Sequence, residues 1–368
     1  MSLLPRHSKE APAISICIPV FQTEQLLERC LASVAAQKET FTDFEVLIIN
    51  DCSDGTDEEG RGTKQVVRRL SKKFGLPVKL ISHSKNRGLF EVRRTGAINA
   101  RGRYITQLDS DDMLVPGALK ALFDTAVATD ADLVHGHSTA GSVVNGEWKV
   151  AEENRYSQIY YGTLEGHEVF RGWLIEKKFT ANIWGKLVKR ELYAATFEEI
   201  PYTQCNMAED MLAFFFLGQK VKKYVGIQTE VYKYVVDTGM SSRRTIDSMQ
   251  KFRMICSAAS VFTIISSWLE EHKSAHGLTE EGRTVWRYPL AADEIKALKH
   301  RTRFYLYNNI MQMRQRVIPE LQAEARAMLC DYWGEDFVAF VENDIALMEA
   351  DARRKAEEAS IIKDADPE

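Results

Sequence analysis

The sequence predicts an α/β fold, built on a mostly parallel sheet flanked by helices, with a helical C-terminal extension. Two observations lead to this prediction. Up to about residue 136 the chain alternates short β-branched apolar runs with helical stretches, and this alternation is typical of a parallel sheet covered by helices. Beyond about residue 243 the pattern becomes predominantly helical. A length of 368 residues allows one large domain or two ordinary ones.

Five apolar runs in the first part of the chain are predicted strands, because each is short and rich in β-branched residues. They cover residues 14–20, 44–50, 78–82, 104–108 and 131–136. The first helix is predicted to open at Thr23 as its N-cap, with Leu27, Cys30 and Leu31 on its buried face.

The middle of the chain predicts a hairpin, two helices and two further strands. Asn145 and Gly146 lie between β-like flanks, and an Asn-Gly pair in that position is a strong hairpin signal. The helices are expected at residues 164–179 and 208–218, and the strands at 221–227 and 230–237.

Composition limits the class of protein. Apolar residues make up 45% and charged residues 27% of the chain, as in ordinary soluble proteins. A net charge of -4 argues against a nucleic-acid binder. No apolar run approaches the length of a membrane span, and the start of the chain lacks the apolar segment of a secretion signal. The six cysteines form no disulfide-like framework, so a cytoplasmic location is expected.

Polar loops follow three of the predicted strands. Their sequences are "NDCSDGT" at 50–56, "HSKNRG" at 83–88 and "DSDD" at 109–112. The carboxyl ends of parallel strands meet at one edge of a sheet, where α/β proteins bind ligands. The three loops therefore predict a binding site at that edge.

Three carboxylates lie within four positions of the last of these loops, at Asp109, Asp111 and Asp112. Like charges this close repel one another unless a cation lies among them. The turn after the first strand has no glycine to cradle phosphates, so a bound diphosphate would need a cation, and Mg²⁺ or Mn²⁺ takes carboxylate and phosphate oxygens as ligands. Taken alone, the loop could equally be a polar turn before the helix near Pro116.

Five segments resemble, in order and spacing, the motifs of family-2 glycosyltransferases with the GT-A fold, a nucleotide-diphospho-sugar transferase fold. The segments are "SICIPVFQTEQLLERCLASVAAQ", "FEVLIINDCSDGT", "NRGLFEVRRTGAINARGRYITQLDSDD", "WGKLVKREL" and "AEDM". The resemblance implies an inverting hexosyltransferase that uses a nucleotide-diphospho-sugar, a UDP-sugar in particular, and a divalent metal. It also implies a saccharide or glycolipid acceptor in bacterial surface polysaccharide synthesis.

The resemblance assigns roles on the donor side by position. Pro19 and Phe21 line the nucleotide pocket, Asp51 recognises the base and Arg93 approaches the nucleotide. Asp109 lies near the ribose, and Asp111 holds the metal, as Mn²⁺ or Mg²⁺. The chain departs from the family pattern at Phe21-Gln22, where Tyr-Asn is common, and at residues 92–94, which read Val-Arg-Arg instead of Ala-Arg-Asn.

On the acceptor side the resemblance makes Asp210 the catalytic base and Glu209 its neighbour. A base is needed because a sugar hydroxyl is a poor nucleophile at neutral pH. Without that context, acids at a helix start would be read as partners of the helix dipole. Trp184 and Lys186 match the family's acceptor-side element, although a tryptophan in an apolar run could simply be core. Ser242 and Arg243 match a loop that folds over the diphosphate.

The expected division of the chain follows the motifs. Residues 1–12 are a flexible N-terminus, 13–243 the catalytic domain, 244–355 a helical region and 356–368 a charged, disordered tail. The helical region could contact a membrane surface, a second copy of the chain, or only the catalytic domain. Two other functions remain open: a non-catalytic nucleotide-sugar or carbohydrate-binding module, and a nucleotidyltransferase, which usually has a glycine-rich loop after the first strand.

Overall fold

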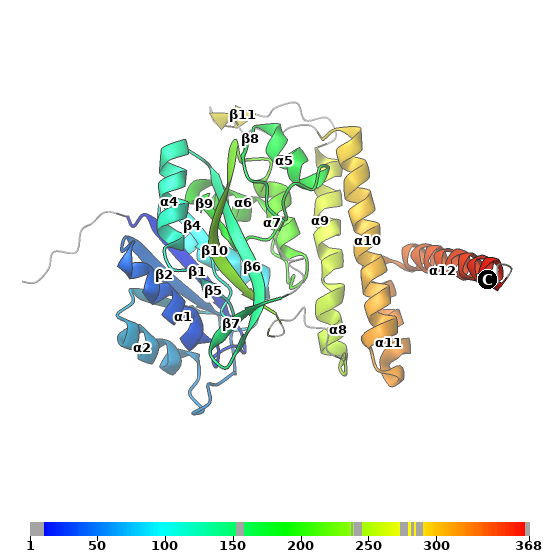
Figure 1. Ribbon diagram of the computed structural model, residues 1–368, viewed down its shortest axis with the longest axis horizontal. Helices are drawn as coiled ribbons and strands as arrows, with labels where there is room; N and C mark the ends of the chain where they lie inside the picture. Colours follow the sequence, from blue (N-terminus) through cyan, green and yellow to red (C-terminus); the bar gives the residue numbers. More distant parts are fainter. Residues whose placement is uncertain are drawn as a thin grey trace, which may run out of the picture.

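The structure is a computed structural model that describes residues 11–151, 158–236, 238, 245–272, 279–280, 283–284 and 290–364. Its centre is a ten-stranded sheet in the order β3-β2-β1-β4-β9-β6-β10-β5, with β7 paired to β6 and β8 to β10 (Figure 1). The strands are β1 (Ile14–Val20), β2 (Phe44–Asn50), β3 (Val78–Ser82), β4 (Tyr104–Gln107), β5 (Met113–Leu114), β6 (Leu133–Val144), β7 (Glu147–Val150), β8 (Thr163–Glu165), β9 (Lys186–Lys189) and β10 (Lys223–Val235). Two short strands, β11 (Thr279–Glu280) and β12 (Arg283–Thr284), pair separately.

Helices flank the sheet and then form the C-terminal region. The α-helices are α1 (Leu27–Ala36), α2 (Thr63–Phe74), α3 (Leu89–Asn99), α4 (Ala118–Thr129), α5 (His167–Leu174), α6 (Arg190–Glu199), α7 (Glu209–Leu217), α8 (Met249–Cys256), α9 (Ala258–Glu271), α10 (Ala292–Arg316), α11 (Gln322–Trp333) and α12 (Glu335–Asp364). We call α8 to α12 the helical extension. The predicted α/β fold with such an extension is confirmed.

The first four strands of the predicted alternation form a parallel unit. β1 pairs in parallel with β2 and with β4, and β2 pairs in parallel with β3. β9 then runs antiparallel to both β4 and β6, so the sheet is more mixed than the sequence predicts. The reason is that β9 enters at the carboxyl end of β4, beside the bridge between Gln107 and Trp184, and runs back along it. This entry brings a second part of the chain to the predicted site.

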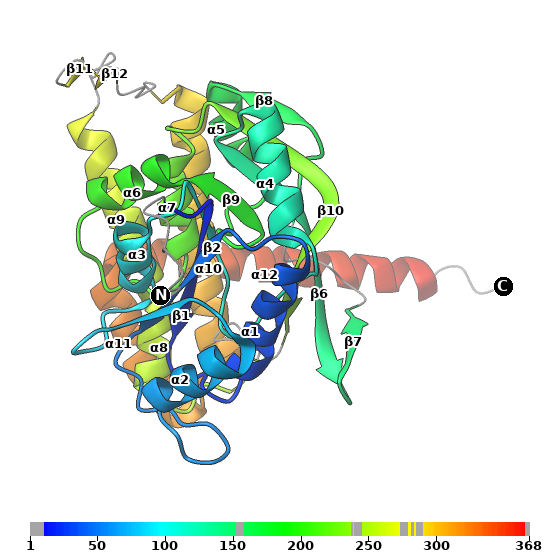
Figure 2. The ribbon, with the colours of Figure 1, turned by 90° about the vertical axis from the view of Figure 1, so that its left-hand side faces the viewer.

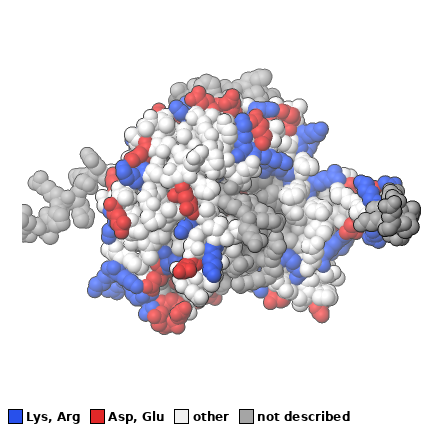
Figure 3. All heavy atoms as spheres, in the orientation of Figure 1, with Lys and Arg blue, Asp and Glu red and all other residues white. Residues whose placement is uncertain are grey.

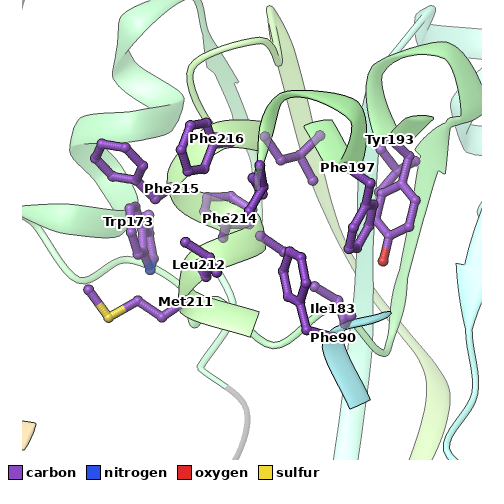
Figure 4. Packing of buried hydrophobic residues seen from close by; sticks show 14 of the residues in the cluster. Phe90, Trp173, Ile183, Tyr193, Phe197, Met211, Leu212, Phe214, Phe215 and Phe216 are labelled. Carbon is purple, nitrogen blue, oxygen red and sulfur yellow. The ribbon is translucent and has the colours of Figure 1, made fainter. Parts of the chain in front are cut away.

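The edge strand β3 has no fully buried residue, but β1, β2 and β4 bury both faces. Ile16 and Ile18 of β1 pack with α1, α2 and α4, whereas Cys17 between them packs with α3 and α7. Such alternation follows from the period of two in a strand, and burial on both faces explains why these strands are apolar throughout. The buried cluster on the Cys17 side of the sheet contains a group of aromatic side chains from α3, α5, α6 and α7 (Figure 4). That packing fixes α7, which begins with two of the predicted site residues.

Several local predictions can be compared with the structure. The hairpin is confirmed: β6 ends at Val144, β7 starts at Glu147, and Asn145 and Gly146 have φ of 53° and 82°, as a two-residue turn between such strands requires. The N-cap at Thr23 is wrong. α1 begins at Leu27, since the Thr23 hydroxyl instead bonds that of Ser110 at 2.7 Å.

The two strands predicted at 221–227 and 230–237 form the single strand β10. Its register against β6 shifts between Ile227 and Tyr232. The sequence predicts two strands here because the bulge at this register shift interrupts the apolar alternation of β10.

The helical extension packs against the sheet unit through α9 and against itself through the other helices. Val261, Phe262 and Ile265 of α9 belong to the same buried cluster as Phe214 of α7. A separate cluster joins α8, α10, α11 and α12. α12 projects beyond the remaining helices in both ribbon views (Figures 1 and 2). The predicted division at residue 243 falls outside the described residues and stays a prediction.

Two features of the helical extension differ from the sequence expectations. The stretch Met249–Glu271 has the length and composition of a membrane span, so the expectation that no apolar run is that long is wrong. In the structure 56% of its most apolar part is buried, and a core helix has the same length and composition. Helix α12 continues to Asp364, into the predicted disordered tail, because Ala, Glu, Lys and Arg favour helix.

Candidate active site

The predicted site residues gather at the carboxyl ends of β1, β2 and β4 and at the starts of β9 and α7. Val20 pairs with Asn50 at the ends of β1 and β2, and Cys17 pairs with Gln107 near the end of β4. The residues that follow these strands therefore share one edge of the sheet. Acidic and basic side chains are interspersed over the face of the molecule in Figure 3.

The aspartate loop after β4 is fixed by its last member, Asp112. Its carboxylate is buried and accepts hydrogen bonds from the Tyr232 hydroxyl and the Val235 amide, both at 2.7 Å. Burial raises the pKa of Asp112, and the negative charge of Asp111 adds to this effect. Asp112 therefore anchors the loop to β10, whereas Asp109 and Asp111 make no part of this anchor.

Asp111 has few partners for a carboxylate in this position. It accepts a hydrogen bond from the Thr238 hydroxyl at 2.9 Å, and Arg29 donates to its backbone oxygen at 2.6 Å. Burial raises the pKa of Asp111, and the neighbouring charge of Asp109 raises it further. Among the residues that the structure describes, no group of three or more His, Cys, Asp or Glu side chains could hold a metal ion.

Arg93 joins the aspartate loop to the start of α7. Its guanidinium, 3% exposed, lies 3.1 Å from Asp109 Oδ1 and 3.3 Å from Glu209 Oε1. Burial by itself would lower the pKa of Arg93, but the charges of Asp109 and Glu209 outweigh it and raise that pKa above its usual value. A single buried cation thus holds two predicted site carboxylates, Asp109 and Glu209, that lie 100 positions apart in the sequence.

Glu209 and Asp210 form a pair of adjacent acids on the first turn of α7. Burial and the charge of Asp210 raise the pKa of Glu209 to about 7. Burial also raises the pKa of Asp210. A hydrogen bond from the Met211 amide, which lies 2.7 Å from Oδ1, acts in the opposite direction. The pKa of Glu209 thus lies near neutrality and that of Asp210 is shifted in the same direction, which favours a group that must accept a proton.

Lys186 is a buried amine on β9 near these acids. Burial lowers the pKa of Lys186 to about 7, and the negative charge of Asp210 opposes that shift. Its Nζ donates to the carbonyl of Thr180 at 3.2 Å and also to the carbonyl of Asn182. The structure therefore places the predicted acceptor-side lysine within the electrostatic reach of the predicted base.

Trp184 packs against two tyrosines of β10. Its ring stacks on Tyr232 with centroids 4.9 Å apart and on Tyr234 at 5.3 Å. The ring is buried and supports Tyr232, which in turn holds Asp112. The packing alternative for this tryptophan fits the geometry better than stacking on a sugar.

Asp51 is buried at the end of β2 and faces the 83–88 loop. It accepts hydrogen bonds from His83 Nδ1 at 2.7 Å and from the amides of Arg87 and Gly88 at 2.9 Å. These bonds shape the turn that leads into α3, on which Arg93 lies. Of the other two predicted donor residues, Pro19 is buried in β1, and Phe21 is 39% exposed at its end.

Three residues around the aspartates were not predicted from the sequence. Tyr232 and Thr238 reach the loop from β10 and the residues that follow it, and Arg29 reaches it from α1. No local pattern marks them, because each contact joins positions far apart in the chain. The matched loop residues Ser242 and Arg243 lie outside the described residues.

Residues 15–184 match the family model "Glycosyl transferase family 2". This match, over a little less than half of the chain, confirms the predicted resemblance to family-2 glycosyltransferases and their GT-A type of fold. The match includes the aspartate loop and Trp184 but ends before α7.

Known relatives cover parts of the chain. It is 26% identical to glycosyltransferase GlyA of Streptococcus pneumoniae over 237 residues, which are 62% of this chain and 31% of GlyA. It is 33% identical to the poly(ribitol-phosphate) beta-N-acetylglucosaminyltransferase TarP of Staphylococcus aureus over 124 residues, 33% of this chain and 36% of TarP. The chain thus matches about a third of the length of these relatives.

A solved structure of S. aureus TarS residues 1–349 with UDP-GlcNAc is also similar. It is 18% identical, with a TM-score of 0.49, over 90% of this chain and 92% of that chain.

Proposed function

We propose that this chain is an inverting glycosyltransferase that transfers a sugar from a UDP-sugar to a hydroxyl of a saccharide or glycolipid acceptor, in bacterial surface polysaccharide synthesis. The observation that carries the proposal is the bridge by Arg93, which holds Asp109 of the aspartate loop and Glu209 of the acid pair within 3.3 Å of one guanidinium. Such a bridge fits a site in which a donor and an acceptor must meet. The proposed location is the cytoplasm, at the inner face of the membrane.

Asp210 is proposed as the base. Its carboxylate accepts the proton of the acceptor hydroxyl while that oxygen forms a bond to the anomeric carbon, and the bond from this carbon to the diphosphate oxygen breaks. Attack from the side opposite the leaving group inverts the anomeric centre, and no second carboxylate is needed as a nucleophile. The name of TarP, a beta-N-acetylglucosaminyltransferase, agrees with such an outcome. Lys186 favours the ionised form of Asp210, since its charge lowers the pKa of that acid.

The donor side has the chemistry to hold a divalent metal. Asp111 offers hard oxygen ligands, and burial and the charge of Asp109 raise its pKa despite the opposing charge of Arg29. Mg²⁺ and Mn²⁺ are commonly held by one or two carboxylates together with the phosphates of a substrate, so Asp111 and Asp109 fit such an ion. When bound, the metal would neutralise charge on the departing diphosphate. Phe21 and Pro19 are proposed to line the nucleotide pocket, with Asp51 near the nucleobase.

A panel of nucleotide sugars tests the proposal. With Mn²⁺ present, one of them at a hundred times its Kd should raise the free energy of unfolding by about 2.7 kcal/mol, and the enzyme should hydrolyse it slowly without an acceptor. Addition of candidate saccharides should then yield a product of inverted anomeric configuration, seen by NMR. Binding without hydrolysis or transfer would indicate the binding-module alternative, and retained configuration would contradict the single-base mechanism.

Replacement of Asp111 by alanine is expected to weaken UDP binding strongly and to remove its dependence on metal. The reason is that the variant loses the carboxylate proposed to hold the ion that bridges to the diphosphate. Calorimetry with Mn²⁺ and with EDTA measures both effects. Asp124→Asn, which changes an exposed carboxylate on α4, serves as the control. Equal affinity of the wild-type protein in Mn²⁺ and EDTA would exclude the metal role of Asp111.

A further inference from the structure

The segment that leads into α7 is held on one side by the N-terminus of α3. The Phe90 amide donates to the carbonyl of Cys205 at 3.2 Å, and the Leu89 amide donates to Asn206 Oδ1 at 2.9 Å. These amides belong to the first turn of α3, where they have no partner within the helix. Arg93 lies one turn further along the same helix, so the segment and the buried cation share one support.

On its other side the segment is held by the helical extension. Ser257 lies at the junction of α8 and α9 and is 5% exposed. Its Oγ accepts a hydrogen bond from the Asn206 amide at 3.1 Å and donates to the carbonyl of Met254 at 2.5 Å. Its carbonyl is 3.8 Å from Cys205 Sγ, which donates to it. Ser257 therefore joins the backbone of this segment to the backbone of α8.

The position of the two acids depends on the backbone just before them. Ala208, immediately before Glu209, has a φ of 62°, in the left-handed region that residues with a Cβ rarely adopt. Such a conformation persists only where its surroundings enforce it. The bonds to Cys205 and Asn206 from α3 and from Ser257 are the contacts that can enforce it, since they hold the chain two and three positions earlier.

The helical extension also reaches the acids by packing. The ring of Tyr305 on α10 contacts that of Phe262 on α9 in a tilted arrangement, with centroids 5.2 Å apart, and both pack in the cluster that contains Met211. Burial raises the pKa of Tyr305, and the negative charge of Asp210 contributes to the increase. Two separate parts of the extension thus lie close to the first turn of α7.

We propose that Ser257 is a positioning residue for Glu209 and Asp210, and that the helical extension, although it lies outside the family match, is part of the catalytic unit. The assignment rests on the proposed function in so far as Asp210 is the base. Loss of the Ser257 hydroxyl would leave the Asn206 amide without its partner and loosen the segment that presents the acids. The donor-side contacts of Asp51 and Asp111 involve other loops and would remain.

Ser257→Ala tests this inference, beside Ser257→Thr, which keeps the hydroxyl, and Thr302→Ala, which removes a hydroxyl that donates within α10. The first readout needs no activity. Hydrogen exchange of the peptide spanning residues 203–212 should increase in Ser257→Ala and not in the other two, whereas the peptides around residues 51–55 and 109–112 should exchange as in the wild type. Unchanged exchange at 203–212 would overturn the positioning role.

The second readout is catalytic. For the nucleotide sugar identified by the panel, the kcat of hydrolysis should fall by about 10-fold in Ser257→Ala. UDP affinity, measured by calorimetry, should stay within twofold of wild type. Ser257→Thr should restore the activity. Parallel loss of kcat and UDP affinity would indicate general unfolding and contradict the inference. If the exchange change appears while even the wild-type protein neither hydrolyses nor transfers any sugar, the positioning of the segment stands and the proposed function fails.

Discussion

Asp210→Asn is expected to lower sugar transfer by about 10²-fold or more while UDP affinity changes little. The amide has nearly the same shape as the carboxylate but cannot accept the proton of the acceptor hydroxyl, and removal of a general base typically costs this much. A factor of 10² corresponds to about 2.7 kcal/mol of lost transition-state stabilisation. Asp210 makes no ion pair in the part of the chain that the structure describes, so the fold should tolerate the change. Single-turnover transfer beside calorimetric UDP binding measures both quantities.

Glu209→Gln is the matched comparison, because it makes the same replacement of a carboxylate by an amide on the neighbouring acid. Glutamine can still accept a hydrogen bond from Arg93 through its amide oxygen, so transfer should fall far less than in Asp210→Asn. The variant should also shift the pH profile. Activity is lost as pH falls because the base becomes protonated, and removal of a like charge beside Asp210 should move that loss to lower pH. Near-normal transfer by Asp210→Asn, with Glu209→Gln inactive, would reverse the two assignments.

The fold and the meeting of the polar loops at one sheet edge could be predicted from the sequence because their signals are local. Strands that bury both faces read as unbroken apolar runs, and polar loops that follow such runs must meet at one sheet edge. Asp109 and Asp111 were found in this way, although their roles rest on the family resemblance. The turn at Asn145 and Gly146 was equally local, since two adjacent residues supply both positive φ angles.

The rest could not be predicted, because it depends on contacts between distant segments. Tyr232 anchors Asp112 from a strand 120 positions later, and Ser257 bonds Asn206 from the helical extension. The Thr23 prediction failed for the same reason: a hydroxyl suited to cap a helix bonded Ser110 across the site. The family resemblance makes Arg93 a nucleotide contact, but its bond to Glu209 joins two motifs that lie far apart in the sequence.

Arg93→Ala is expected to cost about 3 kcal/mol or more of folding stability at pH 8. The substitution leaves Asp109 and Glu209 largely buried without their cation, and removal of one partner from a buried ion pair is strongly destabilising. Arg101→Ala is the matched control, since Arg101 pairs with Glu45 but its own side chain is 70% exposed. Exposed pairs of this kind are usually worth about 1 kcal/mol or less. Urea unfolding of both variants beside the wild type gives the two differences.

The pH dependence of that cost identifies its source. The pKa of Glu209 is about 7 in the folded protein, above its ordinary value, and loss of Arg93 removes a charge that lowers it. A carboxyl whose folded pKa is raised binds its proton more tightly in the native state, so protonation stabilises the fold as pH falls. The deficit of Arg93→Ala should therefore shrink between pH 8 and pH 5.5, whereas that of Arg101→Ala should not. A deficit that stays constant over this range would mean that Arg93 stabilises the protein by packing alone, and the bridge between the aspartate loop and α7 would lose its electrostatic basis.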